Sequence, residues 1–322
     1  MTATPRRNSR LAVVALGGNA ILRNGERGEF AQQFENTRWS MRAIGELITT
    51  GYDVVVTHGN GPQVGNLMLM VDHARGLVPE TPLSVANAMT SGSMGYMIAQ
   101  CLRNMMLASG VRKNVVTVPA QVLVDKDDPA MSHPSKPIGP FYQEQEARAL
   151  AREKGWILRD DARRGWRRYV ASPYPVDIIE KDAIRHLLDQ GFVVITCGGG
   201  GVPVRLESDG TLSGVDGVID KDLASMRLAL SIGAAILVII TAVPRVSLKF
   251  GEPEQQDLPC MTVAQARHFQ EEQQFPSGSM GPKIQAAIEF VQADARNRAI
   301  ITDVDGLVPA LEGKEGTTVV AG

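Results

Sequence analysis

The chain has 322 residues, 44% of them hydrophobic, which is enough to bury the core of one large α/β domain or of two smaller lobes. A formal net charge of −2 excludes an overall positive field that would favour nucleic acid or an anionic membrane. Cys101, Cys197 and Cys260 are too far apart for a CxxC zinc site or a disulfide framework, so we expect buried thiols in a reducing compartment.

Non-alternating runs of Val, Ile and Leu predict strands that are buried on both faces of a sheet. These runs cover residues 10–16, 52–58, 114–124, 192–196, 235–243 and 298–302. Helical patterns alternate with them, at residues 34–51, 143–155, 175–191 and 281–295. The alternation predicts an α/β fold, a three-layer αβα sandwich around a mostly parallel sheet.

The longest apolar run, residues 228–243, contains Ser231 and Gly233, so it predicts a helix end followed by a core strand and not a membrane span. The N-terminus carries arginines but lacks the apolar stretch of a signal peptide. We therefore expect a cytoplasmic protein with no membrane segment.

The stretch from about Asp125 to Pro175 interrupts the alternation, because it is rich in proline and polar residues. Long irregular segments in compact domains are usually functional or flexible. We interpret this stretch as an inserted lid subdomain, with an ordinary surface excursion as the alternative.

Glycines follow three of the predicted strands, at residues 17–18, 59–61 and 198–201. Ligands of open α/β sheets bind outside the carboxyl ends of the strands, and bare backbone lets N–H groups approach an anion. The pattern favours a shared phosphate-binding floor over glycines that serve only tight turns.

Several common catalytic motifs are absent from the sequence, namely the GxxxxGK[ST] P-loop, a GxGxxG after a strand, HExxH and GxSxG. The five histidines show no metal-ligand spacing, so we expect structural roles for them. His58 is the one that lies at a glycine-rich strand end.

Three lysines are candidates for phosphate contacts: Lys136 in the predicted lid, and Lys221 and Lys283 at predicted helix starts. A lysine at a helix N-terminus opposes the helix dipole, which is unfavourable unless an anion is bound there. Solvated surface charge is the alternative for each lysine alone. Of the flanking carboxylates, Asp222 can cap its helix, and Asp220 is better placed to hold Lys221.

Taken in order, the stretches ALGGNAI, HGNGPQVG, SKPIGPFY, CGGGGVPV, VIDKDLAS and GSMGPKIQAA resemble carbamate kinases of the amino acid kinase superfamily. The resemblance implies a central sheet of about eight mostly parallel strands and a homodimer. It implies reversible phosphoryl transfer between carbamoyl phosphate and ADP, giving ATP and carbamate. Magnesium would be held by nucleotide phosphates and water, with no protein metal site.

The resemblance also implies a division of the chain. Residues 11–218 would form a lobe that binds carbamoyl phosphate and carries the lid at about 125–175. Residues 219–322 would form the nucleotide-binding lobe.

Individual residues match the family's functional positions. The expected catalytic set is Lys136, Lys221 and Lys283, to which we add Asp220. The expected floor for carbamoyl phosphate comprises Gly17, Gly18, Asn19, Gly59, Asn60 and Gly61, and the glycine pattern adds Gly199 and Gly200. The expected nucleotide contacts are Thr241, Ala242, Val243, Gly278 and Met280.

The chain departs from the family pattern at Pro244, where an acidic residue is common, and at Ser247, where an aromatic residue is common. Loss of an aromatic neighbour is expected to weaken nucleotide stacking. A kinase of another small carboxylate and a non-catalytic anion sensor are the alternative functions, and the retained lysines argue against the sensor.

Overall fold

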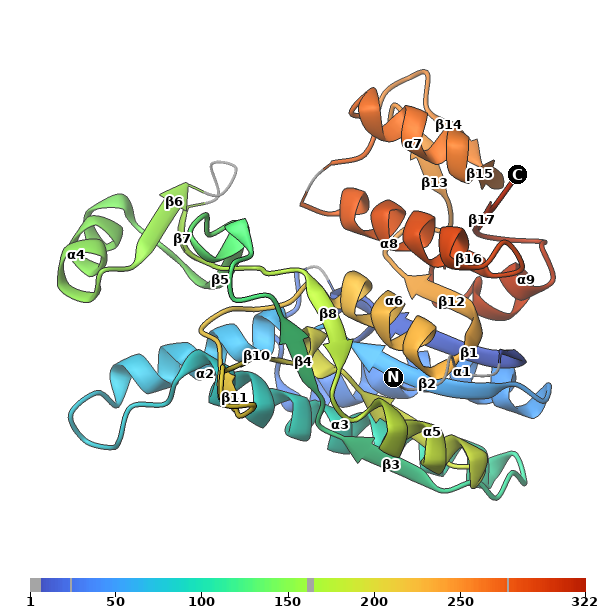
Figure 1. Ribbon diagram of the computed structural model, residues 1–322, viewed down its shortest axis with the longest axis horizontal. Coiled ribbons are helices and arrows are strands. Elements are labelled where there is room, and N and C mark those ends of the chain that lie inside the picture. The colour runs from blue at the N-terminus through green and yellow to red at the C-terminus, as the bar shows by residue number, and fades with distance from the viewer. Residues whose placement is uncertain (1–6, 24, 161–164, 277) are drawn as a thin grey trace.

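The computed structural model describes residues 7–23, 25–160, 165–276 and 278–322. Its centre is an eight-stranded sheet in the order β15-β17-β16-β12-β1-β2-β9-β3 (Figure 1). Every pair of neighbouring strands is parallel except β16 and β17. The strands are β1 (Asn8–Leu16), β2 (Asp53–His58), β3 (Val115–Val118), β9 (Val193–Thr196), β12 (Ala234–Ile240), β15 (Cys260–Thr262), β16 (Arg298–Thr302) and β17 (Thr317–Val320). The predicted α/β fold with a mostly parallel central sheet is confirmed.

Helices cover both faces of this sheet, because alternate residues of each central strand point to opposite sides. In β1, Val13 belongs to one buried hydrophobic cluster, and Val14 belongs to a second cluster on the opposite face of the sheet. Both side chains are fully buried, as expected for strands without polar alternation.

The helices vary from five to 26 residues in length. They are α1 (Phe30–Thr49), α2 (Gly61–His73), α3 (Leu83–Ala108), α4 (Glu144–Lys154), α5 (Lys181–Asp189), α6 (Lys221–Ile232), α7 (Val263–Glu271), α8 (Met280–Ala293) and α9 (Leu307–Leu311), with short 3₁₀ turns at η1 (Gly18–Ala20), η2 (Pro129–Met131) and η3 (Gly198–Gly200). In the part of the chain that the structure describes, none of the helices has both the length and the apolar character of a membrane span.

Two of the sequence predictions about elements need correction. The run 114–124 forms two strands in different sheets, β3 and β4 (Gln121–Val124), because Pro119 cannot donate to a continuous ladder. The predicted helix 175–191 begins only at Lys181, because residues 175–178 form strand β8 (Pro175–Ile178). The run 228–243 is a helix end and a core strand, as predicted, with Gly233 at φ 75° between them.

A smaller sheet, in the order β11-β10-β4-β8, carries the interrupting segment. Its other strands are β10 (Val202–Leu206) and β11 (Leu212–Gly214). The chain leaves β4 and returns in β8, and these two strands are antiparallel neighbours. A separate hairpin, β13 (Val246–Leu248) with β14 (Gln256–Leu258), follows β12.

Between β4 and β8 lies an arm, defined here as the described parts of residues 136–170. It consists of β5 (Lys136–Tyr142), α4, β6 (Ile157–Asp160) and β7 (Trp166–Val170), with the sheet order β5-β7-β6. Figure 1 shows the arm projecting from the body on the same side as α2. The interrupting segment therefore has regular structure of its own, although its composition suggested an irregular one.

Candidate active site

The glycine-rich turns meet at one edge of the central sheet. Strands β1, β2 and β9 are consecutive neighbours, and β12 lies on the other side of β1. Residues 17–18, 59–61, 198–201 and 241–243 follow the carboxyl ends of these four strands. At the centre, a Cβ on Gly17 would lie 2.6 Å from the carbonyl oxygen of Ile240, so a residue without a side chain is required where β1 and β12 end.

The four consecutive glycines at 198–201 are buried, and close packing explains them. A Cβ on Gly199 would lie 2.3 Å from both Asn60 Nδ2 and Asn87 Oδ1. The backbone at Gly199, Gly200 and Gly201 has φ of 66°, 86° and 82°, values that favour glycine. The bare backbone thus lets this turn fit against α3 and the turn after β2, a reason for glycine beyond the predicted approach of an anion.

Substitution of Gly199 by alanine should lower the free energy of unfolding by at least ~2 kcal/mol, from left-handed strain of about 1–3 kcal/mol and a steric clash of similar size. Urea unfolding measures this loss. Gly210 also has a positive φ, of 85°, but a Cβ there would have no atom within 4 Å, so Gly210→Ala is the control that carries strain alone. Equal effects of the two substitutions would contradict the packing explanation.

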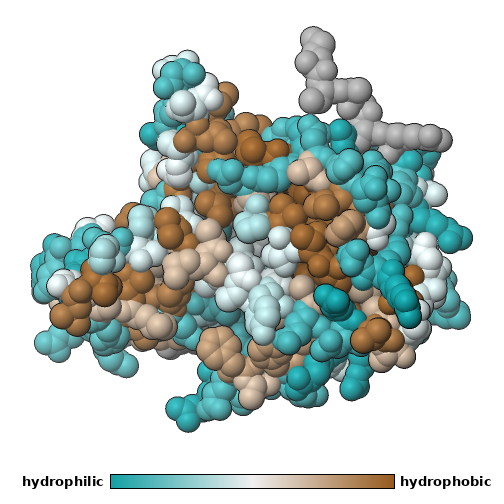
Figure 2. All heavy atoms as spheres, turned by 90° about the horizontal axis from the view of Figure 1, so that it is seen from below, coloured by the Kyte–Doolittle hydropathy of each residue, from teal (hydrophilic) through white to brown (hydrophobic). Residues whose placement is uncertain are grey.

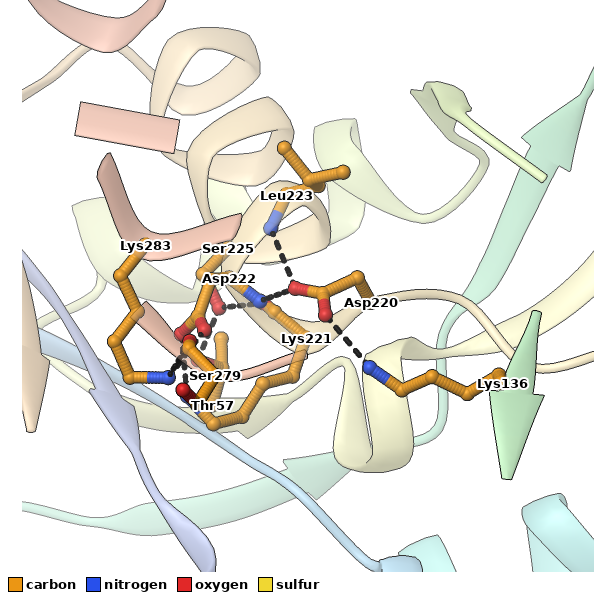
Figure 3. A network of polar contacts seen from close by, with 9 residues as sticks. All are labelled: Thr57, Lys136, Asp220, Lys221, Asp222, Leu223, Ser225, Ser279 and Lys283. Carbon is orange, nitrogen blue, oxygen red and sulfur yellow. Dashed lines mark hydrogen bonds and ion pairs between the residues drawn. The ribbon is translucent and has the colours of Figure 1, made fainter. Parts of the chain in front are cut away.

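Two of the predicted lysines share one carboxylate. Lys221 begins α6 and Lys283 lies in the first turn of α8, and their side chains converge on Asp222 (Figure 3). Lys221 Nζ donates to Asp222 Oδ1, and Lys283 Nζ donates to Asp222 Oδ2 at 3.1 Å. Lys283 Nζ also donates to the Ser279 carbonyl at 3.2 Å, which brings the turn before α8 to the same place.

Burial and charge act against each other in this cluster. Burial alone would raise the pKa of Asp222, but Lys221 and Lys283 outweigh it and lower the pKa to about 2. Burial lowers the pKa of Lys221, with repulsion by Lys283 adding to the effect and the Asp222 charge opposing it. An anionic ligand beside Lys221 would favour its charged form.

Hydrogen bonds of two hydroxyl groups connect the start of α6 to strand β2. The hydroxyl groups of Thr57, in β2, and Ser225 are 2.6 Å apart, and Ser225 Oγ donates to the Lys221 carbonyl at 2.6 Å. The sequence predictions included neither residue, because Thr57 and Ser225 become neighbours only when α6 packs beside β2.

The third lysine pairs with Asp220, the aspartate that was predicted to hold Lys221. Lys136, at the base of the arm, donates to Asp220 Oδ2 at 2.8 Å, and Asp220 Oδ1 caps α6 by accepting from Asp222 N at 2.9 Å. The prediction that Asp220 holds Lys221 and that Asp222 caps the helix was therefore wrong. The Asp-Lys-Asp sequence does not determine which carboxylate points inward, since that depends on where α6 begins.

His58 and Gly59, at the end of β2 and the start of the following turn, both have structural roles. A Cβ on Gly59 would lie 3.3 Å from Lys221 Cδ, so glycine leaves room for that lysine to cross the turn. His58 is buried, and burial lowers its pKa to about 4, so the ring is neutral at physiological pH. Its Nδ1 donates to the Gly59 carbonyl at 3.0 Å, a structural role of the kind that was predicted.

The residues predicted to contact a nucleotide lie after β12 and at the start of α8. The Thr241 N–H donates to the Thr302 carbonyl at 2.8 Å, which ties this turn to β16. Ser247, one of the two departures from the family pattern, is 7% exposed and donates its hydroxyl to Asp257 Oδ1 at 2.7 Å. Its side chain therefore serves the β13–β14 hairpin and presents no ring for stacking.

The cysteines take no part in this cluster. Cys101 and Cys197 are buried, as predicted, and burial raises the pKa of Cys197 to about 12. Cys260 is exposed at the start of β15, so the prediction of a buried thiol was wrong there.

Comparison with known proteins shows the family and the fold of this chain. The family model described as the amino acid kinase family matches residues 10–303. The carbamate kinase of Pyrococcus furiosus is 48% identical over 96% of this chain and 98% of its own length, and that of Clostridium perfringens is 42% identical over 96% and 99%. The solved structure of carbamate kinase from Giardia lamblia bound to AMP-PNP is 42% identical, covers 97% of this chain and 98% of its own, and superposes with a TM-score of 0.90.

Proposed function

The chain belongs to the amino acid kinase family, among its carbamate kinases, and on that premise we propose how its residues transfer a phosphoryl group between carbamoyl phosphate and ADP. The observation that supports the proposal is the meeting of Lys136, Lys221 and Lys283 from three separate elements beside the glycine-rich edge. Cations and backbone N–H groups are what a transferring phosphoryl group needs, since no protein nucleophile is required.

In the proposed step, a terminal phosphate oxygen of ADP forms a bond to the phosphorus of carbamoyl phosphate. The bond between that phosphorus and the carbamate oxygen breaks, and carbamate leaves with the bonding electron pair. Lys221 and Lys283 lie on the nucleotide side and neutralise charge on the equatorial oxygens. Lys136 approaches from the arm. In the reverse direction, ATP and carbamate give ADP and carbamoyl phosphate.

We assign carbamoyl phosphate to the turns after β1, β2 and β9, the residues being Gly17, Gly18, Asn19, Gly59, Asn60, Gly61, Gly199 and Gly200. The exposed backbone of Gly18 is open to an approaching anion, with no atom within 4 Å of the position that a Cβ would take. Gly199 and Gly200 are buried, so their contribution is to hold the floor in place.

We assign the nucleotide to the opposite side of the lysine cluster, at Thr241, Ala242, Val243, Gly278 and Met280. The contact between Lys283 and Ser279 supports this, because it places the turn before α8 next to the phosphate-binding lysines. In this arrangement residues 11–218 bind the carbamoyl substrate and residues 219–322 bind the nucleotide. With Pro244 and Ser247 in place of an acidic and an aromatic residue, weaker stacking of the base stays a prediction.

Magnesium would enter with the nucleotide. Mg²⁺ keeps several waters and binds substrate phosphates readily. The carboxylates nearest to the lysines, Asp220 and Asp222, are already occupied by ammonium groups and a helix cap. This donor set fits an ion held by ADP or ATP phosphates and water.

A homodimer is supported by an apolar surface on α3. Val85, Met89, Tyr96 and Leu107 lie along this helix and are 47% to 69% exposed. Figure 2 shows hydrophobic side chains gathered on the face of the molecule that carries α2 and α3. Covering such a patch with a second copy would remove it from water. Light scattering that gives the mass of a single chain would contradict the dimer.

The cytoplasmic location stays a prediction.

The reaction is tested by mixing the protein with carbamoyl phosphate, ADP and magnesium and by following ATP. Folded protein that forms no ATP would exclude the proposed reaction. A panel of small carboxylic acids with ATP tests the alternative of another acceptor, which the relatives do not favour. Ligand-induced stabilisation without turnover would identify an anion sensor.

Substitution of Lys136 by alanine should lower kcat while leaving the unfolding midpoint close to that of the unchanged protein. The side chain of Lys136 is 37% exposed, so its ion pair with Asp220 contributes little to stability. Steady-state kinetics and thermal unfolding measure the two quantities. If the arm is only a surface excursion, the substitution will be nearly silent in both.

A further inference from the structure

The arm has a narrow connection to the body. Its chain enters after β4 and leaves into β8, and at the base the Ser135 N–H donates to the Val170 carbonyl at 3.1 Å. Only these two adjacent segments join the arm to the body. The orientation of the arm relative to the body therefore depends on its other contacts.

Helix α2 provides those contacts at both of its ends. Near its start, a Cβ on Gly65 would lie 3.0 Å from the Cα of Gly139, so β5 packs against the backbone of the helix. Near its end, Lys154 Nζ, from the last residue of α4, donates to Asp72 Oδ1 at 2.5 Å. Gly65 and Asp72 are separated by two turns of α2, so at 1.5 Å per residue the ion pair is roughly 10 Å further along the helix.

The ion pair between Asp72 and Lys154 is largely removed from solvent. The two side chains are 16% and 12% exposed. Lys154 Nζ lies 4.3 Å from the ring centre of Trp156, and Arg168 Cζ lies 4.5 Å from the same ring. Arg168 also pairs with Asp216 of the body at 3.6 Å. A buried pair of this kind is costly to break, because removing one partner leaves the other charge unpaired.

Around the Asp72–Lys154 ion pair, the space between the arm and the body is only partly filled by side chains. A cavity of about 880 Å³ lies between the outer part of the arm, α2 and β11, and Asp72, Lys154, Trp156 and Arg168 are among the residues that line it. Apolar packing of Ile138 and Val170 with Val64 of α2 holds the base of the arm, but it does not fill this outer junction. The charged contacts across the cavity hold the outer part of the arm.

Paired strands connect the Asp72–Lys154 contact to Lys136 at the base of the arm. Trp156 leads directly into β6, which pairs with β7, and β7 pairs with β5. Lys136, at the start of β5, is the register partner of Val170 in β7. A tilt at Lys154 would therefore move the strand that carries Lys136.

We propose that Asp72 and Lys154 are positioning residues, which hold the arm against α2 and thereby hold Lys136 over the site. The proposal rests on the role given to Lys136 under the proposed function. It adds two residues that touch no substrate, in a junction outside the candidate active site.

The first test is kinetic. Asp72→Asn should lower kcat/KM for carbamoyl phosphate on the order of 10-fold, since small misplacement of a catalytic group has effects of this size. Asp72→Glu, which keeps the carboxylate, should recover most of the loss. Glu144→Gln is the matched control, because it breaks the pair with Arg148 on the same helix α4, where both side chains are more than half exposed; it should leave kcat/KM unchanged.

The same substitution in a Lys136→Ala background separates positioning from general damage. If Asp72 acts through Lys136, Asp72→Asn will cause no further loss in that background. A loss of the same factor in both backgrounds, or an unchanged rate in the single variant, would overturn the proposal. Circular dichroism and thermal unfolding confirm that each variant is folded.

The second test does not depend on activity. Spin labels at Arg152→Cys in α4 and Asp189→Cys in α5, in a Cys260→Ser background, report the distance between arm and body. Asp72→Asn should broaden the distance distribution, and an unchanged distribution would overturn the proposal. Should the unchanged protein form no ATP, the proposed function would fail, and the distance measurement would still decide whether the ion pair fixes the arm.

Discussion

Alanine at Lys221 or at Lys283 should lower kcat by on the order of 10²-fold or more, through loss of charge stabilisation in the transition state. Both lysines are held on Asp222, with side chains 13% and 14% exposed, so their ammonium groups are fixed before any substrate arrives. The loss should appear in kcat and in kcat/KM alike, because the contact is strongest when charge spreads over the transferring group. Initial rates of ATP formation at saturating substrates measure it.

The chain offers a matched control at another helix. Helix α5 begins with Lys181-Asp182, as α6 begins with Lys221-Asp222, but Lys181 pairs with Asp177 and takes no part in the Asp222 cluster. Lys181→Ala should therefore leave kcat close to normal. Near-normal turnover in both site variants would refute the roles given to Lys221 and Lys283.

Replacing Asp222 by alanine should have the largest effect on stability, about 3–5 kcal/mol, because it leaves two buried ammonium groups without their counter-charge. The carboxylate is 2% exposed and accepts from both lysines. Denaturant unfolding at neutral pH measures the loss. Asp182→Ala is the control, since Asp182 holds the same position in α5 but forms an exposed pair with Arg185 and should cost less than ~1 kcal/mol.

The lowered pKa of Asp222 gives this prediction a pH dependence with a defined sign. The unfolded chain protonates an aspartate near its ordinary pKa of about 3.9. The paired carboxylate therefore stabilises the fold fully above that pH, and its contribution is lost as the pH falls toward the folded pKa of about 2. The difference in unfolding free energy between the unchanged protein and Asp222→Ala should shrink over this interval. A difference independent of pH would contradict the ion-pair explanation.

Much of the fold could be predicted because the central strands are uniformly apolar. Runs such as 235–243 and 298–302 need burial on both faces, and only a sheet between two helical layers provides it. The glycines at 17–18 and 59–61 then fall at strand ends, and parallel strands bring those ends to one edge. The lysines could be identified as candidates because their helix-start positions are unfavourable without a bound anion.

The remaining features depend on tertiary contacts that one sequence does not contain. The choice between Asp220 and Asp222 depends on the start of α6 and on the approach of α8, whose Lys283 lies 61 residues from Asp222 along the chain. Gly199 is required by Asn60 and Asn87, which approach from other elements. Its neighbours are close to other residues: Gly198 lies against His58 and Ser91, Gly200 against Ile219, and Gly201 against Val122. The strand at 175–178 was predicted as helix, because its apolar residues also fit the helical pattern that follows.

The adjacent entry and exit of the arm have a consequence for the evolution and engineering of this enzyme. Since β4 and β8 are antiparallel neighbours, everything between them is topologically a single long hairpin loop. Loop-closure entropy grows only slowly with loop length, so segments of different size can be grafted at this point at modest cost to the body. The length of the arm is thus the feature of this enzyme that can change most readily while the central sheet stays intact.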